Sequence, residues 1–220
     1  MNINKHLILL FSVLFFLFAV SVSSGCFRKN ESDVKSVVRN ELDQLKNLDS
    51  ETTQKYIPYT ELFPDATENT DLTDEINKTF SLFFRKFNYK ISDVIVGTAN
   101  HSATVSVKLT TIDSKVLARD FKAELLRTQI TESAQAQKGN IKDSSRSLEA
   151  HYLILNHLLN TNDYDTAETD CNIQLVNTGN DKKEKWKIQR TNSLEDDLVG
   201  GLIADLADPD ILSPEDTLTV

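Results

Sequence analysis

The stretch YKISDVIVGTANHSATVSVKLTTID, from Tyr89 to Asp113, has the clearest periodicity in the chain. Two β-rich runs, Tyr89 to Val96 and Ala103 to Ile112, flank the turn formers Gly97 to Ser102, which is typical of an antiparallel hairpin. In the second run, apolar residues alternate with threonine, serine and lysine, so one face is predicted to be buried and the other solvated. The predicted inward residues of that run are Val105, Val107 and Leu109.

Before the hairpin, apolar residues recur every three or four positions, which indicates amphipathic helices. We expect helices over residues 31–48, 50–57 and 71–88, with Pro58 ending the second. The third carries an aromatic stripe, which predicts a core face, with a ligand-lining role for one or two rings as the alternative. The stripe consists of Ile76, Phe80, Phe83, Phe84 and Phe87.

After the hairpin, helical spacing returns over residues 114–137 and 147–160. A second strand pair is predicted at 167–176 and 185–190, with Trp186 and Ile188 pointing inward. One more helix follows, with Asn192 or Ser193 as its N-cap, and extends through Leu206. The pattern therefore predicts an α+β fold: a curved antiparallel sheet of four or slightly more strands packed against several amphipathic helices.

The N-terminus reads as an export signal. Lys5 and polar residues precede the apolar run LILLFSVLFFLFAV, Leu7 to Val20, and small residues follow it. The run from Leu7 to Val22 is shorter than the roughly 20 residues needed to span a bilayer. A cleaved signal peptide is therefore favoured over a permanent transmembrane helix.

The residues SSGC at the end of this segment resemble the lipobox of bacterial lipoproteins, in which a small residue precedes the acylated cysteine. Gly25 and Cys26 match these two positions, whereas Ser23 stands where the family prefers leucine. The resemblance implies cleavage before Cys26 and lipid attachment to its sulfur, which would place the protein on the extracytoplasmic face of the cell membrane. The alternative is an ordinary cleaved secretory signal.

These features give the expected domain organisation. Residues 1–25 form the lipoprotein signal peptide, 26–31 a lipidated tether, 32–207 a single α+β domain and 208–220 a polar C-terminal tail. Removing 25 of the 220 residues leaves 195, which suits one domain and is short for the two lobes of a solute-binding lipoprotein.

Composition excludes several classes of protein. The formal net charge of −9 makes nucleic acid an unsuitable partner. With Cys26 lipidated, Cys171 has no partner cysteine, so a disulfide framework, a cysteine-rich zinc site and a CxxC redox pair are all excluded. The alternation around Cys171 predicts a small buried thiol on a strand.

No catalytic, cofactor-binding or metal-ligating residue is predicted. His151 and His157 are six residues apart on one predicted helix, whereas a helical metal site needs a spacing of three or four. His101 falls in the hairpin turn, where a solvated imidazole is expected. The acidic stretch near residue 165 does not match a calcium loop, and neither phosphate-binding glycine motifs nor a GxSxG elbow occurs.

The order of elements, the closing strand WKI (Trp186 to Ile188) and the following GGL (Gly200 to Leu202) resemble a group of secreted lipoproteins from low-GC Gram-positive bacteria. That group is similar to nuclear transport factor 2-like or cystatin-like domains, in which a curved sheet wraps around a long helix. The resemblance covers roughly residues 31–206. Because the group has no assigned activity, it implies no catalytic residue.

Two functions follow as hypotheses. The first is a non-catalytic module, tethered to the membrane by lipid, that binds a protein, peptide or small molecule on the concave sheet face. The alternative is a small pocket enzyme, an isomerase, dehydratase or hydrolase, that uses a buried carboxylate pointing inward from the sheet. The strands offer mostly apolar and hydroxyl side chains at inward positions, which favours the binding module.

Overall fold

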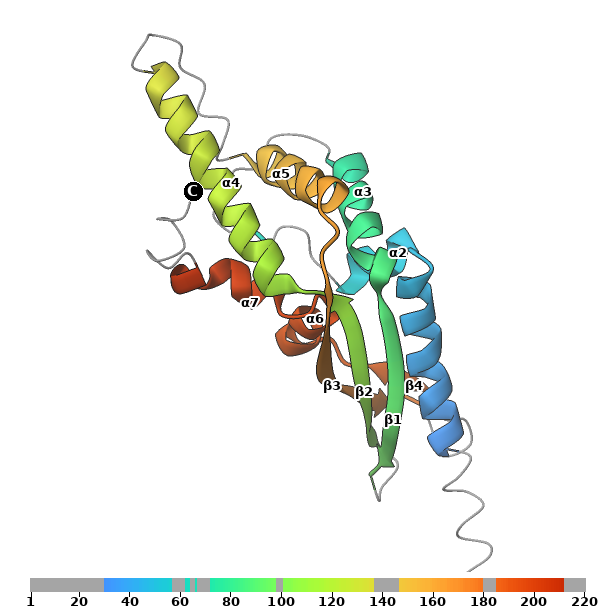
Figure 1. Ribbon diagram of the computed structural model, residues 1–220. Helices are drawn as coiled ribbons and strands as arrows, with labels where there is room; N and C mark the ends of the chain where they lie inside the picture. Colours follow the sequence, from blue (N-terminus) through green and yellow to red (C-terminus); the bar gives the residue numbers. More distant parts are fainter. Residues whose placement is uncertain are drawn as a thin grey trace, which may run out of the picture. The chain divides into compact units, whose positions relative to one another are not determined.

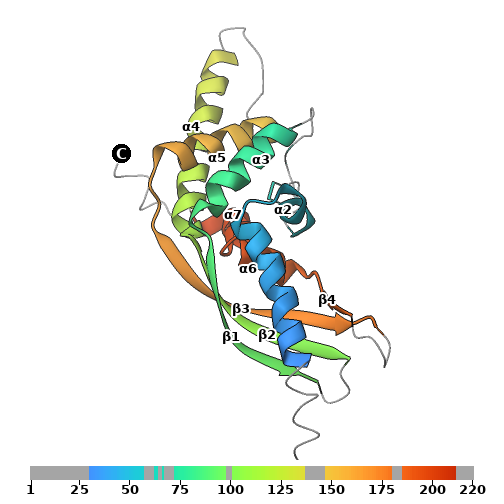
Figure 2. The same cartoon turned by 90° about the vertical axis from the view of Figure 1, so that its right-hand side faces the viewer.

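The computed structural model describes residues 30–56, 62–63, 66, 72–97, 101–136, 147–179 and 185–211. It confirms the α+β class (Figures 1 and 2). After a first helix at residues 30–46, the elements in chain order are α2 Ser50–Tyr56, α3 Thr73–Phe83, η1 Phe84–Lys86, β1 Asn88–Val96, β2 Ser102–Ile112, α4 Ser114–Ala136, α5 Leu148–Thr161, β3 Thr166–Asn177, β4 Trp186–Ile188, α6 Asn192–Leu198, α7 Leu202–Ala207 and η2 Pro209–Ile211.

The four strands form one sheet in the order β1-β2-β3-β4. The predicted hairpin is β1 and β2, and the amide of Gly97 donates to the carbonyl of Ser102 across its turn at 2.9 Å. The predicted second pair is β3 and β4, which run antiparallel with Leu175 opposite Ile188. The period-two pattern therefore located all four strands.

The chain divides into two compact units that alternate along the sequence. The first contains Met1–Arg39, Asp93–Val105 and Ile173–Gln189, and the second contains Asn40–Ser92, Ser106–Asn172 and Arg190–Val220. Helix 30–46 and three of the strands pass from one unit to the other.

In the first unit, a small core forms from alternating strand positions and one helix face. The predicted inward orientation of Trp186 and Ile188 is confirmed, because both are buried while Lys187 between them is exposed. On the opposite, wet face, the hydroxyl of Thr104 donates to the side chain of Gln174 at 3.0 Å. The buried apolar residues are Val34, Val38, Val96, Ala103, Val105, Ile173, Leu175, Trp186 and Ile188.

In the second unit, helices α3, α4, α5 and α7 pack on one another: α3 lies beside α5, and α4 lies beside both α5 and α7. The aromatic stripe of α3 and η1 is buried as predicted. Phe84 is only 1% exposed, and its ring centroid lies 5.5 Å from that of Phe83 and 5.3 Å from that of Phe87. Such tilted aromatic packing adds to the free energy of burying the rings.

The single closing helix expected up to Leu206 is wrong. It breaks into α6 and α7 at Gly200 and Gly201, whose φ angles of +66° and +90° lie in the left-handed region that only glycine adopts readily. The N-cap of α6 is Thr191, whose hydroxyl accepts from the amide of Leu194 at 3.1 Å, not Asn192 or Ser193.

Two further details differ from expectation. Residues 30 and 31, assigned to the tether, already belong to the first helix. In α4 the buried positions end at Phe121. Helical spacing predicts Leu126 or Ile130 on the apolar side with Phe121, but the two are 43% and 61% exposed. The second half of α4 keeps its helical hydrogen bonds without burying an apolar face among the described residues.

Candidate binding pocket

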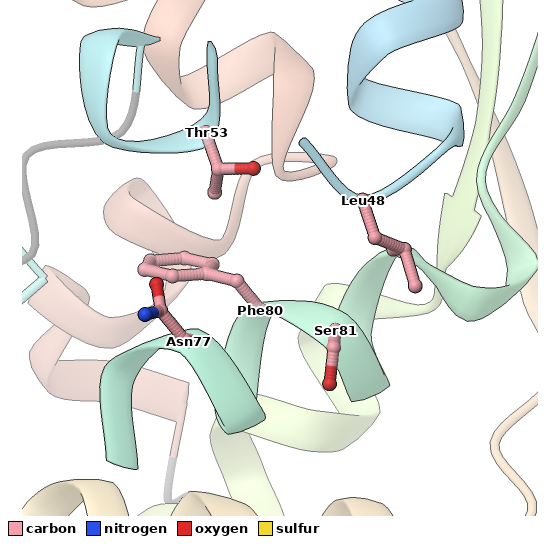
Figure 3. Close-up of a pocket in the computed structure, with 5 residues that line it drawn as sticks. All are labelled: Leu48, Thr53, Asn77, Phe80 and Ser81. Atoms are coloured by element: carbon pink, nitrogen blue, oxygen red, sulfur yellow. The ribbon is translucent and has the colours of Figure 1, made fainter. Parts of the chain in front are cut away.

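The second unit contains a pocket between α2, α3 and the turn that precedes α2 (Figure 3). The enclosed cavity is small, about 40 Å³, within a partly open space of about 270 Å³ among the lining atoms. Its walls are two apolar side chains and three uncharged polar ones. The five residues are Leu48, Thr53, Asn77, Phe80 and Ser81.

Leu48 reaches the pocket because the first helix ends there in an unusual way. The amide of Asp49 donates to the carbonyl of Gln44 at 3.0 Å, and that of Leu48 donates to Leu45 at 3.0 Å. This is a Schellman end, which places one residue in the left-handed conformation and normally uses glycine. Here that residue is Leu48, with φ of +62°.

This conformation of Leu48 is strained. A left-handed leucine costs about 1–2 kcal/mol relative to an ordinary helical residue. The side chain is 43% exposed, so its own burial offsets little of that cost. Backbone strain of this kind tends to occur at functional positions. Leu48 therefore presents an apolar side chain at the pocket at a cost in backbone strain.

The polar wall is held by short local hydrogen bonds. The hydroxyl of Thr53 donates to the carbonyl of Asp49 at 2.9 Å, within the first turn of α2. The hydroxyl of Ser81 donates to the carbonyl of Lys78 at 2.8 Å, one turn back along α3. Both hydroxyl groups are thus fixed in orientation by the backbone of their own helices.

Asp49 lies in the chain between two of the lining residues and carries a charge beside the pocket. Its carboxylate accepts from the hydroxyl of Thr52 at 2.6 Å and from the amide of Thr52 at 2.8 Å. These bonds, the hydroxyl bond first, lower the pKa of Asp49 below its ordinary value. The group is therefore anionic at neutral pH.

Sequence reasoning found only part of this site. It identified Phe80 as a stripe residue with a possible ligand-lining role, and Phe80 does line the pocket while remaining 5% exposed. It missed the other four lining residues. Leucine after a helix gives no signal of a left-handed turn, and the polar residues have no motif spacing.

The one site residue predicted from the sequence, the lipid-attachment residue Cys26, lies outside the described residues. Cys171 is buried on β3, as predicted. Burial, aided by the nearby Asp197 carboxylate, raises the pKa of the Cys171 thiol to about 12. The thiol is therefore protonated at neutral pH and is a poor nucleophile.

The three histidines that the structure describes do not assemble a site. His101 is exposed, as expected for a turn residue. The ring of His151 packs 4.8 Å from that of Phe63, and its Nδ1 lies 2.8 Å from the carbonyl of Ser147. Within the described ranges, no group of three or more histidine, cysteine, aspartate or glutamate side chains could hold a metal ion.

A second cluster combines an acid with a buried tyrosine. Tyr56 is 2% exposed, and burial raises its pKa, with the Glu41 carboxylate adding to the effect. Glu41 pairs with Lys55, whose ammonium lies 2.7 Å from Glu41 Oε1 and 4.8 Å from the centre of the Tyr56 ring. The acid comes from a helix, is held in an ion pair and does not line the pocket.

The adjacent acids Asp196 and Asp197 should respond oppositely to substitution. Asp196 Oδ1 accepts from the amides of Ile203 and Ala204 at 3.0 and 3.2 Å, which caps α7. We expect Asp196→Ala to lower the free energy of unfolding by about 1 kcal/mol. Burial raises the pKa of Asp197, although the Cys171 thiol opposes the shift.

A carboxyl group with a raised folded pKa binds its proton more tightly in the folded state, so stability falls as pH rises from about 4 through the folded value. Asp197→Asn should remove this loss and raise stability at pH 7 by up to about 0.5 kcal/mol, with no gain at pH 3. Urea unfolding of the full-length variants at both pH values measures this. Equal losses in the two variants at pH 7 would contradict the assignment.

Comparison with known proteins gives no similarity: no family profile, no curated protein and no solved structure matches the chain. In the part of the chain that the structure describes, no helix has the length and apolar character needed to cross a membrane.

Proposed function

We propose that this protein is a lipoprotein of the extracytoplasmic membrane face, anchored through Cys26, that works as a non-catalytic binding module. The observation that supports the non-catalytic binding role is the character of the pocket: all five lining side chains are uncharged. A wall of hydroxyl, amide and apolar groups can orient a ligand by hydrogen bonds and contact area. It has no group that can exchange a proton near neutral pH, which general acid–base catalysis requires.

The hypothesis from the sequence placed the ligand on the concave sheet face, whereas the pocket that supports this proposal lies beside α3 and has no strand residue in its lining. We also keep the nuclear transport factor 2-like or cystatin-like fold as a proposal, supported by the sheet order β1-β2-β3-β4 and by the closing WKI strand. Fold likeness alone would not determine the activity.

The alternative of a pocket enzyme needs a desolvated carboxylate that is available as a base. Among the described residues of the second unit, Glu195 is the most buried acid, and its Oε1 accepts from Nε and a terminal nitrogen of Arg190 at 2.8 and 2.6 Å. Glu41 is held by Lys55. Neither acid lines the pocket, so the geometry favours binding over catalysis.

The proposal is tested with four small probes that share an isobutyl tail and differ in the head group: 3-methylbutan-1-ol, 3-methylbutanamide, 3-methylbutanoate and 3-methylbutylammonium. The full-length protein is purified in detergent, and the methyl NMR signals of Leu48 and Thr53 are followed during titration. We expect at least one probe to shift both signals with saturation.

Two substitutions on α3 provide the control. Ser81→Phe puts an aromatic ring into the pocket and should abolish the shifts. Lys78→Phe adds the same ring at an exposed position of the same helix and should leave them unchanged. Absence of saturable shifts with all four probes, or equal shifts in the Ser81→Phe variant, would refute the pocket as the binding site.

A further inference from the structure

The outer side of α4 carries apolar side chains that are open to solvent. From the buried Phe121 to Ile130 the helix makes about two and a half turns, so Ile130 lies on the side opposite the buried one. Leu126, about one turn before Ile130, lies on the same outer side. The two side chains are 43% and 61% exposed, although the rest of the helix is polar enough to remain in water without them.

Basic side chains accompany this apolar pair. Arg119 lies about two turns before Leu126, and Lys122 one turn before it, so both share its side of the helix. Nε of Arg119 lies 3.6 Å from Oδ1 of its neighbour Asp120, and both side chains are largely exposed, so this pair contributes little. The guanidinium therefore keeps donors for another carboxylate. We call Arg119, Lys122, Leu126 and Ile130 the outer stripe of α4.

The last described element of the chain lies beside the outer stripe. The 3-10 helix η2 and the preceding helix α7 both pack on α4 and belong to the same unit (Figure 1). The ammonium of Lys122 donates to the carbonyl of Asp208, immediately before η2. Residues 212–220, which lie outside the described residues, therefore follow directly from a point next to the stripe.

The sequence of residues 212–220, LSPEDTLTV, complements the stripe in charge and in spacing. It contains Glu215 and Asp216 and no basic residue. In an extended chain Leu218 and Val220 share one face about 7 Å apart. Leu126 and Ile130 are about 6 Å apart along α4. Nine extended residues reach about 30 Å, whereas Lys122 and Ile130 are separated by only about 12 Å of helix.

We propose that residues 212–220 of this chain cover the outer stripe of α4. Leu218 and Val220 pack against the apolar pair of the stripe, and the carboxylates of Glu215 and Asp216 lie next to its two basic side chains. Because η2 already holds the segment beside α4, the effective concentration is of the order of millimolar, and a contact that is weak by itself becomes populated.

Charge distinguishes this segment from the one that directly continues α4. Residues 137–146 also lie outside the described residues, but they contain three basic side chains, Lys138, Lys142 and Arg146, and a single acid, Asp143. Like charges would oppose their approach to Arg119 and Lys122. The acidic segment after η2 is therefore the better occupant of the stripe.

A spin label tests the contact in the full-length protein. A nitroxide is attached to Thr219→Cys, and the methyl NMR signals of Leu126 and Ile130 are recorded before and after the label is reduced. Cys171 is buried, and burial raises the pKa of its thiol to about 12, so it does not compete for the label. Protein without the new cysteine, treated with the same reagent, is the reference. We expect the label to remove at least about half of both intensities; unchanged intensities would overturn the proposal.

Two pairs of variants show whether the loss of intensity reports this contact. Leu218→Asp should restore the Ile130 signal, whereas Thr217→Asp puts the same charge on the other face of the extended segment and should leave it broadened. On the helix, Leu126→Asp should restore the Ile130 signal, whereas Thr131→Asp, at an exposed position off the stripe, should not. Equal effects within either pair would contradict the proposed packing.

Two further measurements identify a different occupant. Isotope-labelled protein without the spin label is mixed with spin-labelled protein of natural isotope abundance. Loss of intensity in this mixture would mean that the stripe is covered by a second copy of the chain, which would overturn the contact within one molecule. If the Ile130 signal instead ignored the spin label and shifted on addition of phosphatidylglycerol vesicles, an anionic membrane surface would be the partner and the proposal would be wrong.

Discussion

Replacing Gly200 with alanine is expected to lower the free energy of unfolding by about 3 kcal/mol. Two effects combine. The φ angle of +66° places an alanine in the left-handed region, which costs about 1–2 kcal/mol. The added Cβ would also lie 2.2 Å from Oγ1 and 3.2 Å from Cβ of Thr111. Thr111 is 1% exposed on β2, so relieving the overlap needs a shift within packed structure, at a cost of about 1–3 kcal/mol.

The neighbouring glycine is a matched control. Gly201 has φ of +90°, but a Cβ there would meet nothing closer than Oγ of Ser114 at 3.7 Å. Gly201→Ala should therefore show the conformational cost alone, about 1–2 kcal/mol. Urea unfolding of the full-length variants gives both values, and equal losses would show that the overlap with Thr111 contributes nothing.

A second substitution tests the same contact from its other side. Thr111→Ala removes the oxygen that the new methyl group would strike, so it should restore more than about 1 kcal/mol when combined with Gly200→Ala. Additive effects of the two substitutions would contradict a direct contact. The hydroxyl of Ser114, at the start of α4, donates to the Gly200 carbonyl at 2.6 Å and so links this turn to α4. A shift of Gly200 would also disturb that hydrogen bond.

The glycine pair also shows why sequence reasoning missed the break between α6 and α7. Leu194, Leu198 and Leu202 keep a spacing of four across the break, and all three are buried. The apolar pattern therefore continues although the helix does not. In the sequence, the glycine pair of the GGL segment was the only indication that the helix breaks. Why glycine is needed there follows from the close approach of Thr111, which lies on a strand far away in the sequence.

The strands were predictable because the sheet buries one face and solvates the other. In β2, Val105, Val107 and Leu109 are all at most 2% exposed, while Lys108 between them pairs with Glu168 on the opposite face at 3.1 Å. A strand with one buried and one solvated face alternates apolar and polar residues in its sequence. The four-stranded α+β class followed from it.

Helix patterns were less reliable as a guide to burial. The spacing of Leu126 and Ile130 fits an amphipathic helix, and that stretch of α4 is helical, yet both side chains are exposed. Periodicity reports which residues share a face, not whether another element covers that face. The pocket was missed for a related reason: its walls come from segments that only tertiary packing brings together.

The largest expected effect concerns Cys26. If the sulfur carries acyl chains, each buried CH₂ contributes about 0.8 kcal/mol, so two long chains hold the protein to the membrane with on the order of 20 kcal/mol. Wild-type protein should incorporate labelled palmitate and partition into the detergent phase. The full-length Cys26→Ala variant should incorporate no label, while Cys171→Ala, which removes the buried thiol, should be labelled as wild type.

Partitioning has to be compared with the N-terminal sequence of each variant, because an uncleaved leader is itself apolar from Leu7 to Val22. Processing coupled to lipidation predicts that wild-type protein begins at the modified Cys26 and that Cys26→Ala keeps the leader. Labelling of Cys26→Ala at the wild-type level would refute the anchor. A wild-type N-terminus at any other residue would instead favour an ordinary secretory signal, because acylation by this route requires the cysteine to be the first residue of the processed chain.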